Sequence, residues 1–294
     1  MKLVTIDIGG TYIKFGSYDC HTNKLAYLDT SLTPQNNQQE LLSQLVNIVN
    51  RFSDVSGCAI SIPGTIDVER GYVVQGGALQ YNNNTYFADK LSEKIGIPVI
   101  IENDARCAAY AELWQGKLKG IKNALVLVVG TGLGCAIIQN GKIYRGTHLY
   151  AGEFSLIFTK SINQFGFDAV LGNQVGIPKF VSKMSSIYGE EIDGPRVFQL
   201  IEDGERQLSN CFDEYVNNFA TQLFNFQIML DPEKILIGGG ISQNELYMNK
   251  LSQAVEKFYQ KIPIAITHSP IEACQFKSEA NLIGAVRNYM LTKT

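Results

Sequence analysis

The sequence contains no cluster of five or more basic residues and no apolar run long enough to span a bilayer. The formal net charge is -3 over 294 residues, whereas a nucleic-acid-binding surface is basic, so no nucleic-acid partner is expected. The longest apolar run lies around Ala124–Val129, far short of the ~20 residues that a membrane helix needs, so no membrane partner is expected. Because a strand is predicted to start at Leu3, no room remains for a signal peptide, which favours a cytoplasmic protein.

Three sequence signatures are also missing. None of the six cysteines forms a C-x-x-C pair, so we expect reduced, small hydrophobic side chains rather than zinc ligands. No G-x-x-x-x-G-K-[ST] run is present, which excludes a P-loop kinase. The spacing Gly130-x-Gly132-x-Gly134 differs from G-x-G-x-x-G, which argues against a dinucleotide-binding dehydrogenase.

Two glycine-rich turns are present instead, each after a short apolar strand. Gly9-Gly10-Thr11 follows Val4–Ile8, and Gly130–Gly134 follows Leu125–Val129. Glycine lets the backbone approach a ligand closely, and successive N–H groups in such a turn form an anion site. The length suffices for two domains with separate cores. One such turn in each half therefore predicts a duplicated fold that binds a polyphosphate from both sides.

The pattern of strands and helices also repeats. Residues 3–30 predict three short strands, and residues 124–145 repeat that pattern, with Asn140-Gly141 as a hairpin turn. Strands then alternate with helices in both halves, which predicts α/β layers. Helices are expected over Gln38–Phe52, Thr85–Ile95, Asn103–Trp114, Glu205–Met229 and Ser278–Met290, further strands over Gly57–Ile62, Ile97–Ile101, Lys234–Ile237 and Ile262–Ile266, and a helix cap at Ser242.

Six segments, in this order, resemble the ROK family (repressors, open reading frames and sugar kinases) of the actin-like ATPase superfamily. The resemblance extends over nearly the whole chain. The segments are Asp7–Thr11 and Gly130–Gly134 (phosphate motifs), Ser61–Asp67 (a Pro-Gly segment near the sugar), Glu102–Ala105 (the catalytic base), Ala151–Glu153 (the start of an Ala-Gly-Glu-x-Gly-His box) and Gly238–Gly240 (adenosine).

The resemblance implies ATP and Mg²⁺ as cofactors. Asp7 would hold Mg²⁺ through water molecules, because Mg²⁺ keeps much of its hydration shell. Lys14 matches a basic position in some relatives and is a candidate to face the transferred phosphate. The glycines and threonines implied to bind the nucleotide are Gly9, Gly10, Thr11, Gly130, Thr131, Gly132, Gly134, Gly238, Gly239 and Gly240.

The resemblance also implies a sugar site. Asp104 would accept the proton of the attacking sugar hydroxyl, as a general base. Asn103 and Glu153 would hydrogen-bond other sugar hydroxyls and so fix the geometry of attack. Gly64 lies in the Pro-Gly segment near the sugar.

The sequence departs from the family pattern after Glu153. Leu156 replaces the histidine of the box, and residues 158–168 contain none of the cysteines that bind zinc in relatives, so no structural zinc is expected. Asp168 stands where relatives place a sugar-binding glutamate. Substrate choice stays open among glucose, N-acetylmannosamine, fructose and free or phosphorylated β-glucosides.

These observations predict two actin-like (ribonuclease H-like) α/β domains with the active site in the cleft between them. Domain boundaries are expected at 1–117, with the C-terminal helix 278–294 returning to this domain, and at 118–277. The predicted activity is ATP-dependent transfer of a phosphoryl group to a sugar hydroxyl, the 6-hydroxyl of a hexose, N-acetylhexosamine or β-glucoside, by a homodimer. Because no helix-turn-helix precedes Asp7, a kinase is favoured over a repressor. The alternatives are a non-catalytic sugar sensor with the ROK fold and an actin-like assembly ATPase.

Overall fold

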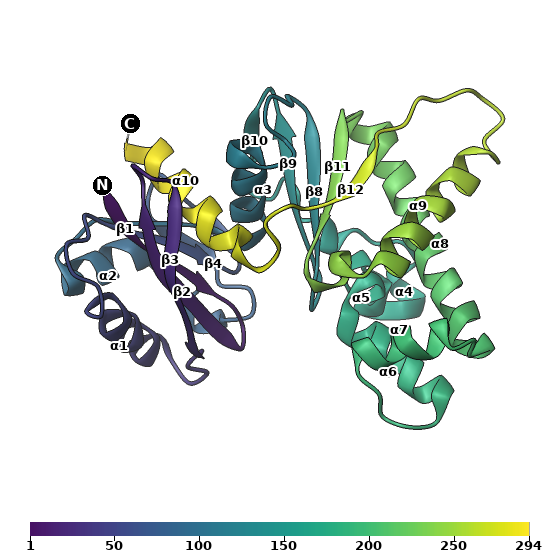
Figure 1. Ribbon diagram of the computed structural model, residues 1–294, viewed down its shortest axis with the longest axis horizontal. Coiled ribbons are helices and arrows are strands. Elements are labelled where there is room, and N and C mark those ends of the chain that lie inside the picture. The colour runs from purple at the N-terminus through teal and green to yellow at the C-terminus, as the bar shows by residue number, and fades with distance from the viewer. Residues whose placement is uncertain (294) are drawn as a thin grey trace. The chain divides into compact units, whose positions relative to one another are not determined.

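The computed structural model describes residues 1–293, with the side chain of Tyr27 excepted, and divides into two compact units. Unit 1 comprises residues 1–120, residues 145–151 and the C-terminal residues from Ser278. Unit 2 comprises residues 121–144 and 152–277. Each unit contains a five-stranded mixed sheet with helices packed on it, so each has a core of its own (Figure 1).

The sheet of unit 1 has the strand order β3-β2-β1-β4-β7. Strands β1 to β3 form the antiparallel meander predicted from the sequence, and β4 and β7 run parallel to β1. Helices α1 and α2 pack on the central strands, and α3 pairs with the C-terminal α10. The bounds are β1 Lys2–Ile8, β2 Tyr12–Asp19, β3 Lys24–Leu32, α1 Gln38–Val49, β4 Cys58–Ile62, α2 Phe87–Ile95, β7 Val99–Asn103, α3 Asp104–Gln115 and α10 Ala280–Lys293.

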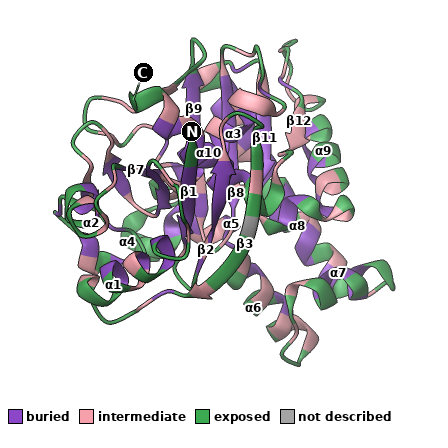
Figure 2. Ribbon diagram, turned by 60° about the vertical axis from the view of Figure 1, so that its left-hand side comes forward, coloured by how far each residue is buried: buried purple, intermediate pink, exposed green. Residues whose placement is uncertain are grey.

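The two faces of β1 are buried against different partners, as the period-two alternation of a strand requires. Val4, Ile6 and Ile8 belong to the apolar core that includes the buried residues of α1 and α2. On the other face, Thr5 Oγ1 donates to the carbonyl of Leu282 in α10 over 2.7 Å. Most residues of β1, β2 and β4 are buried, whereas the edge strand β3 is largely exposed, as Figure 2 shows. The C-terminal helix α10 therefore covers this second face of the sheet, and Figure 1 shows the helix beside the first strands.

Unit 2 repeats this plan with the strand order β10-β9-β8-β11-β12. Strand β8 is antiparallel to β9 and parallel to β11. The 25-residue helix α8 buries one stripe of large apolar side chains and packs on α6, α7 and α9. The bounds are β8 Ala124–Val129, β9 Leu133–Gln139, β10 Lys142–Tyr144, α4 Ile162–Phe165, α5 Leu171–Val175, α6 Ile177–Tyr188, α7 Gly194–Glu202, α8 Arg206–Leu230, β11 Lys234–Gly238, α9 Glu245–Tyr259 and β12 Ile271–Ala273.

Short elements complete the chain. A hairpin of β5 and β6 and the 3₁₀ turn η1 lie between β4 and α2, and four more 3₁₀ turns lie in the second half of the chain. Their bounds are β5 Thr65–Asp67, β6 Tyr72–Gln75, η1 Gln80–Asn82, η2 Phe154–Leu156, η3 Gly166–Ala169, η4 Gly240–Gln243 and η5 Lys277–Glu279. Within residues 1–293, no helix has the length and apolar character that crossing a membrane requires.

Two of the predicted elements are wrong. No strand covers Ile262–Ile266; the strand that pairs with β11 is β12, five residues later. Ser242 does not cap a helix: its hydroxyl donates to the carbonyl of Gly239 over 2.8 Å inside η4. Asn244 caps α9 instead, because its Oδ1 accepts the backbone N–H of Tyr247 over 2.8 Å. An amide or hydroxyl near a helix start can cap it, so sequence alone could not choose between the two residues.

Candidate functional site

The predicted site residues of unit 1 lie at one edge of its sheet. Strands β1, β4 and β7 are parallel, and their register aligns Asp7 with Ser61 and Ser61 with Glu102. Neighbouring strands lie ~4.8 Å apart, so this row of three polar residues spans about 10 Å. Asp104 starts α3 directly after the last strand of the row. The fold thus brings the predicted Mg²⁺ ligand and the predicted base to the same edge, the carboxyl ends of parallel strands.

Asp7 is a buried carboxylate, 8% exposed, at the end of β1. Its Oδ1 accepts the hydroxyl of Ser61 over 2.8 Å and the side-chain amide of Asn281 over 3.0 Å. Burial raises the pKa of Asp7 above its ordinary value, although both hydrogen bonds and the charge of Lys14 act in the opposite direction. The negative charge is therefore incompletely compensated within the protein, and an oxygen-seeking cation would compensate it. This residue thus fits the predicted role of holding hydrated Mg²⁺.

The first glycine turn connects β1 and β2. The N–H of Gly9 donates to the carbonyl of Tyr12 over 2.9 Å and closes the turn. The side chain of Gln35 donates to the carbonyl of Gly10 over 2.8 Å, while Gly10 and Thr11 stay exposed. Lys14 pairs with Asp7 in the register of β1 and β2. A preformed turn with exposed backbone and a nearby lysine is a suitable anion site.

Asn103 and Asp104 form the junction between β7 and α3. The Oδ1 of Asn103 caps α3 by accepting the N–H of Arg106 over 3.1 Å, and its Nδ2 donates to the carbonyl of Gly64 over 3.0 Å. Gly64 has a φ of 107°, and a Cβ there would lie 1.9 Å from the carbonyl oxygen of Gln75. Only glycine therefore fits at position 64. The hydrogen bond from Asn103 to the carbonyl of Gly64 joins the Pro-Gly segment to the β7–α3 junction, which carries the predicted base. Asp104 is half-buried, and its Oδ1 accepts the N–H of Ala105 over 2.8 Å.

The second glycine turn and the Gly238–Gly240 segment lie together in unit 2. Strands β8 and β11 are parallel neighbours, with Val128 aligned to Gly238, so both segments follow the same edge of the sheet. Gly239 has a φ of 87°, and a Cβ there would lie 2.0 Å from the carbonyl oxygen of Val129. The carbonyl of Gly130 accepts the N–H of Ile177, the first residue of α6, over 2.9 Å. The predicted phosphate and adenosine segments thus form one continuous glycine-lined edge.

The remaining predicted residues of unit 2 are Thr131, Gly132, Gly134, Glu153 and Asp168. Thr131 is exposed at the tip of the turn, and the N–H of Gly130 donates to the carbonyl of Gly132 over 3.0 Å. Gly134 lies in β9, and Glu153 directly precedes η2. Asp168 lies in η3 with its side chain 76% exposed, and its carboxylate forms an ion pair with Lys179 of α6. Its predicted sugar-binding role therefore requires this exposed ion pair to open.

One buried ion pair was missed by the sequence analysis. Glu102, which is fully buried, receives two hydrogen bonds from the guanidinium of Arg145: Nη1 to Oε1 over 3.1 Å and Nη2 to Oε2 over 2.5 Å. Burial by itself lowers the pKa of Arg145, because it disfavours the charged guanidinium. The charge of the Glu102 carboxylate and its hydrogen bonds outweigh this effect, so the pKa of Arg145 is raised. The available signal was Glu102 itself: a carboxylate that ends an apolar strand needs a cationic partner.

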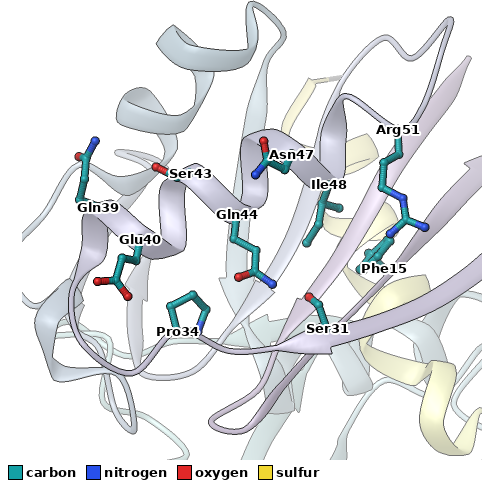
Figure 3. A pocket seen from close by; sticks show the side chains of 10 residues that line it. All are labelled: Phe15, Ser31, Pro34, Gln39, Glu40, Ser43, Gln44, Asn47, Ile48 and Arg51. Carbon is teal, nitrogen blue, oxygen red and sulfur yellow. The ribbon is translucent and has the colours of Figure 1, made fainter.

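Within the described part of the chain, neither a metal cluster nor the pocket beside α1 involves the residues of the predicted site. Among residues 1–293, no group of three or more histidine, cysteine, aspartate or glutamate side chains is arranged to hold a metal ion. A surface pocket of about 550 Å³ lies between α1 and the first strands, as Figure 3 shows. Arg51 covers the ring of Phe15 there, at 4.9 Å, and pairs with Asp29 over 2.8 Å. None of the predicted site residues lines this pocket.

Comparison with known proteins decides the family. The family model described as "ROK family" matches residues 3–290. The chain belongs to the ROK family. It is 29% identical to the β-glucoside kinase of Listeria monocytogenes over 294 residues, which covers 99% of this chain and 98% of that relative.

Two solved structures support the same assignment. A ROK family protein from Streptococcus pneumoniae TIGR4, in complex with sucrose, is 32% identical with a TM-score of 0.88, covering 100% of this chain and 99% of that one. The Lmo2764 protein of Listeria monocytogenes is 28% identical with a TM-score of 0.92, covering 100% of both chains. The predicted family resemblance and the predicted α/β class with two actin-like domains are therefore confirmed.

In the ROK protein described here, the two units are consistent with the two domains of that fold. The predicted domain limits, 1–117 with 278–294 and 118–277, stay predictions. Unit 1 extends three residues further, to Gly120, and it includes residues 145–151, which the sequence analysis assigned to the second domain. That segment carries Arg145, and it ends at Ala151, inside the Ala-Gly-Glu box.

Proposed function

We infer that the chain is an ATP-dependent sugar kinase, and we propose a β-glucoside as its substrate. The kinase activity agrees with the sequence-based prediction and with the family. The β-glucoside is favoured because the relative aligned over 99% of this chain is a β-glucoside kinase. A 32% identical ROK protein solved with sucrose adds that a disaccharide can occupy a protein of this family, as a β-glucoside such as cellobiose would. The observation that carries the proposal is Asp104, retained at the strand-to-helix junction of a chain that matches the ROK model throughout.

The proposed reaction transfers the γ-phosphoryl group of ATP to the 6-hydroxyl of the glucose ring. The hydroxyl oxygen forms a bond to the γ-phosphorus while the bond to the β-phosphate oxygen breaks, which yields ADP and the sugar phosphate. Asp104 accepts the hydroxyl proton, and Asn103, Gly64 and Glu153 orient the sugar. Because the transition state is loose, most of the catalysis is positioning and charge stabilisation.

The proposed nucleotide site uses both glycine edges. Gly9, Gly10 and Thr11 of unit 1 and Gly130–Gly134 of unit 2 offer N–H and hydroxyl donors to the phosphates, and Lys14 faces the transferred group. Gly238–Gly240 would contact the adenosine. Mg²⁺ bound near Asp7 would neutralise phosphate charge, and the incompletely compensated carboxylate supports this role. The sugar-sensor alternative would leave the retained Asp104 without a catalytic task.

A substrate panel tests the proposal. ADP release is measured with ATP, Mg²⁺ and one of cellobiose, an aryl β-glucoside, sucrose, glucose, fructose, N-acetylglucosamine or N-acetylmannosamine. We expect the highest kcat/KM with the β-glucosides, and a 6-deoxy analogue should bind without releasing ADP. If no sugar stimulates ADP release, the kinase assignment fails; if glucose alone does, only the β-glucoside assignment fails.

Assembly and location are further parts of the proposal. The family resemblance leads us to expect a homodimer, which light scattering coupled to size exclusion measures directly. Because the proposed phosphoryl donor is ATP, we place the reaction in the cytoplasm.

A further inference from the structure

The Glu102–Arg145 ion pair lies beside the residues proposed to do the chemistry, yet it has no role in the proposed reaction. The Glu102 carboxylate accepts three donors: the two from Arg145 and the backbone N–H of Asn103, at 2.8 Å from Oε1. The hydroxyl of Tyr110 on α3 accepts a further hydrogen bond from Arg145 over 3.2 Å. A fully buried carboxylate is costly unless donors compensate it in this way, so removing one partner leaves the other uncompensated.

The same carboxylate contacts the junction that carries the proposed base. Asn103, which donates its N–H to Glu102, also caps α3 and donates to Gly64. Asp104 is the next residue. The backbone orientation from which Asn103 and Asp104 project therefore depends on a hydrogen bond to Glu102.

Arg145 begins the segment 145–151, and a second arginine holds the other end of that segment. Arg106 of α3, 2% exposed, donates from Nη2 to the carbonyl of Leu149 over 2.6 Å and reaches the carbonyl of Ala151 at 3.5 Å. The N–H of Ala151 donates to the carbonyl of Arg145 over 3.1 Å, which closes the segment into a loop. Two arginine contacts thus fasten this loop to the β7–α3 junction, and the chain continues directly into Gly152 and Glu153.

We propose that Arg145 and Glu102 are positioning residues: their ion pair fixes the base junction and the start of the sugar-binding Ala-Gly-Glu box to each other. The inference rests on the proposed function, because it assigns Asp104 and Glu153 the roles described above. Arg145 suits this task better than lysine would, since its planar guanidinium donates to both carboxylate oxygens and to Tyr110 at once. Neither residue touches the sugar or ATP in this role.

The test compares Arg145→Lys, Arg145→Gln and Glu102→Gln with Arg51→Gln. Arg51 is a matched control, because it also pairs with a carboxylate, Asp29, but on the surface, where its side chain is 41% exposed. Initial rates give kcat and KM for the β-glucoside and for ATP separately. A nucleotide titration counts binding-competent protein, so that kcat is expressed per folded molecule.

We expect Arg145→Lys and Arg145→Gln to lower kcat/KM for the sugar by about 100-fold, the cost of roughly 1 Å of misplacement, while KM for ATP stays within about twofold. Arg145→Lys should retain part of the folding stability without restoring the rate. Glu102→Gln combined with Arg145→Gln should lose far less than the product of the two single losses, because both remove one interaction. Arg51→Gln should behave as wild type.

Two results would overturn the inference while leaving the kinase intact: kcat/KM for the sugar, per binding-competent molecule, unchanged in both Arg145 variants, or sugar and ATP KM rising together. A purely structural role predicts the first result. If the unaltered protein itself releases no ADP with any sugar, the proposed function has failed, and this outcome is recognised before any variant is measured.

Discussion

At the scale of single residues, Asp104 is the group on which the proposed chemistry depends most directly. Asp104→Asn keeps the size of the side chain and an oxygen that can accept the N–H of Ala105, but it removes the basic carboxylate. We expect kcat to fall roughly 10²–10⁴-fold, the usual contribution of a general base, while ATP affinity is preserved. Steady-state ADP release and a nucleotide titration measure the two quantities.

Asp89→Asn provides the matched control for this variant. Asp89 is an exposed aspartate in the first turn of α2, as Asp104 is in the first turn of α3, so both changes remove a charge from a helix N-terminus. The control should retain full turnover. Equal losses in both variants, or near-normal kcat in Asp104→Asn, would limit Asp104 to stabilising the first turn of α3.

The raised pKa of Asp7 makes a prediction about stability and pH. In the window between the ordinary pKa of an aspartate and the higher folded value, the native state binds more protons than the unfolded state. The free energy of unfolding therefore falls as pH rises through that window, and the loss persists above it. Asp7→Asn removes this loss, so in the absence of Mg²⁺ and nucleotide we expect a higher Tm than wild type at neutral pH.

The gain in Tm should shrink as the pH is lowered from neutrality towards the ordinary pKa of an aspartate, because the wild-type carboxylate, with its raised pKa, then becomes protonated and neutral as well. Although Asp7→Asn should raise Tm, we expect it to lower kcat by about 100-fold or more, since the residue proposed to hold Mg²⁺ would be gone. Thermal melts across this pH range check the sign. A lower Tm of Asp7→Asn at neutral pH would show that the charged form stabilises the fold.

At the scale of elements, the glycine edge of unit 2 can be tested at Gly239. Gly239→Ala adds a Cβ 2.0 Å from the carbonyl oxygen of Val129, in a backbone conformation with a φ of 87°. Gly204→Ala is the matched control: its φ is 95°, but nothing lies within 4 Å of the added Cβ. Both variants carry a strain of roughly 1–3 kcal/mol, but only the first displaces the end of β8.

We therefore expect Gly239→Ala to weaken ATP binding by at least about tenfold, that is by ~1.4 kcal/mol, while Gly204→Ala keeps the wild-type Kd. Isothermal titration with a non-hydrolysable ATP analogue measures both. Unchanged affinity in a folded Gly239→Ala protein would remove Gly238–Gly240 from the proposed adenosine site.

The segment from η2 to η3 is the element in which the sequence departs most from the family pattern. Leu156 replaces the expected histidine, and the expected cysteines are missing. A structural zinc site needs about four nitrogen, sulfur or oxygen ligands, so we expect purified protein to hold less than stoichiometric zinc and to keep its Tm after treatment with a chelator. Elemental analysis decides this, and one zinc per chain that survives chelation would contradict it.

The sequence predicted the strands around both glycine turns because alternation, glycine and apolar runs are local signals. β1 and β8 agree with the expected Val4–Ile8 and Leu125–Val129 to within two residues. The error at Ile262–Ile266 has the opposite cause: three isoleucines in a loop give it a strand-like composition, but pairing with β11 is a tertiary property. The helices α4 to α7 were not predicted, since several are short and their packing on α8 is not local.

The candidate site residues were proposed from equally local signals. Asp7, Asn103 and Asp104 each lie where a recognisable apolar strand ends, in motifs that resemble the ROK family, and their roles stay predictions. Arg145 was not proposed: the carboxylate of Glu102 indicates that a cationic partner exists, but 43 residues separate the two and nothing local identifies which residue it is. The inclusion of residues 145–151 in unit 1 depends on such long-range contacts, so no reading of composition along the chain could have revealed it.

At the scale of the whole molecule, the proposed ligand contacts are divided between the two units. Asn103 and Asp104 belong to unit 1, and Glu153 and the Gly130 turn belong to unit 2. If the sugar and ATP make these proposed contacts, their binding would hold the two units together. Sugar binding would then bring Asp104 to the hydroxyl and exclude water, which limits wasteful ATP hydrolysis.

We therefore predict that the true substrate lowers the radius of gyration in small-angle scattering and raises Tm, since it binds only the folded state. Glu153→Ala should lose both responses to the sugar while its ATP affinity stays within about threefold, because the ion pair of Glu102 and the glycine turns are untouched. Lys160→Ala, which also changes a charged residue of the same stretch of unit 2, is the control and should respond as wild type. A radius of gyration that stays constant on addition of a sugar that stimulates ADP release would refute closure, although that stimulation would still establish the kinase.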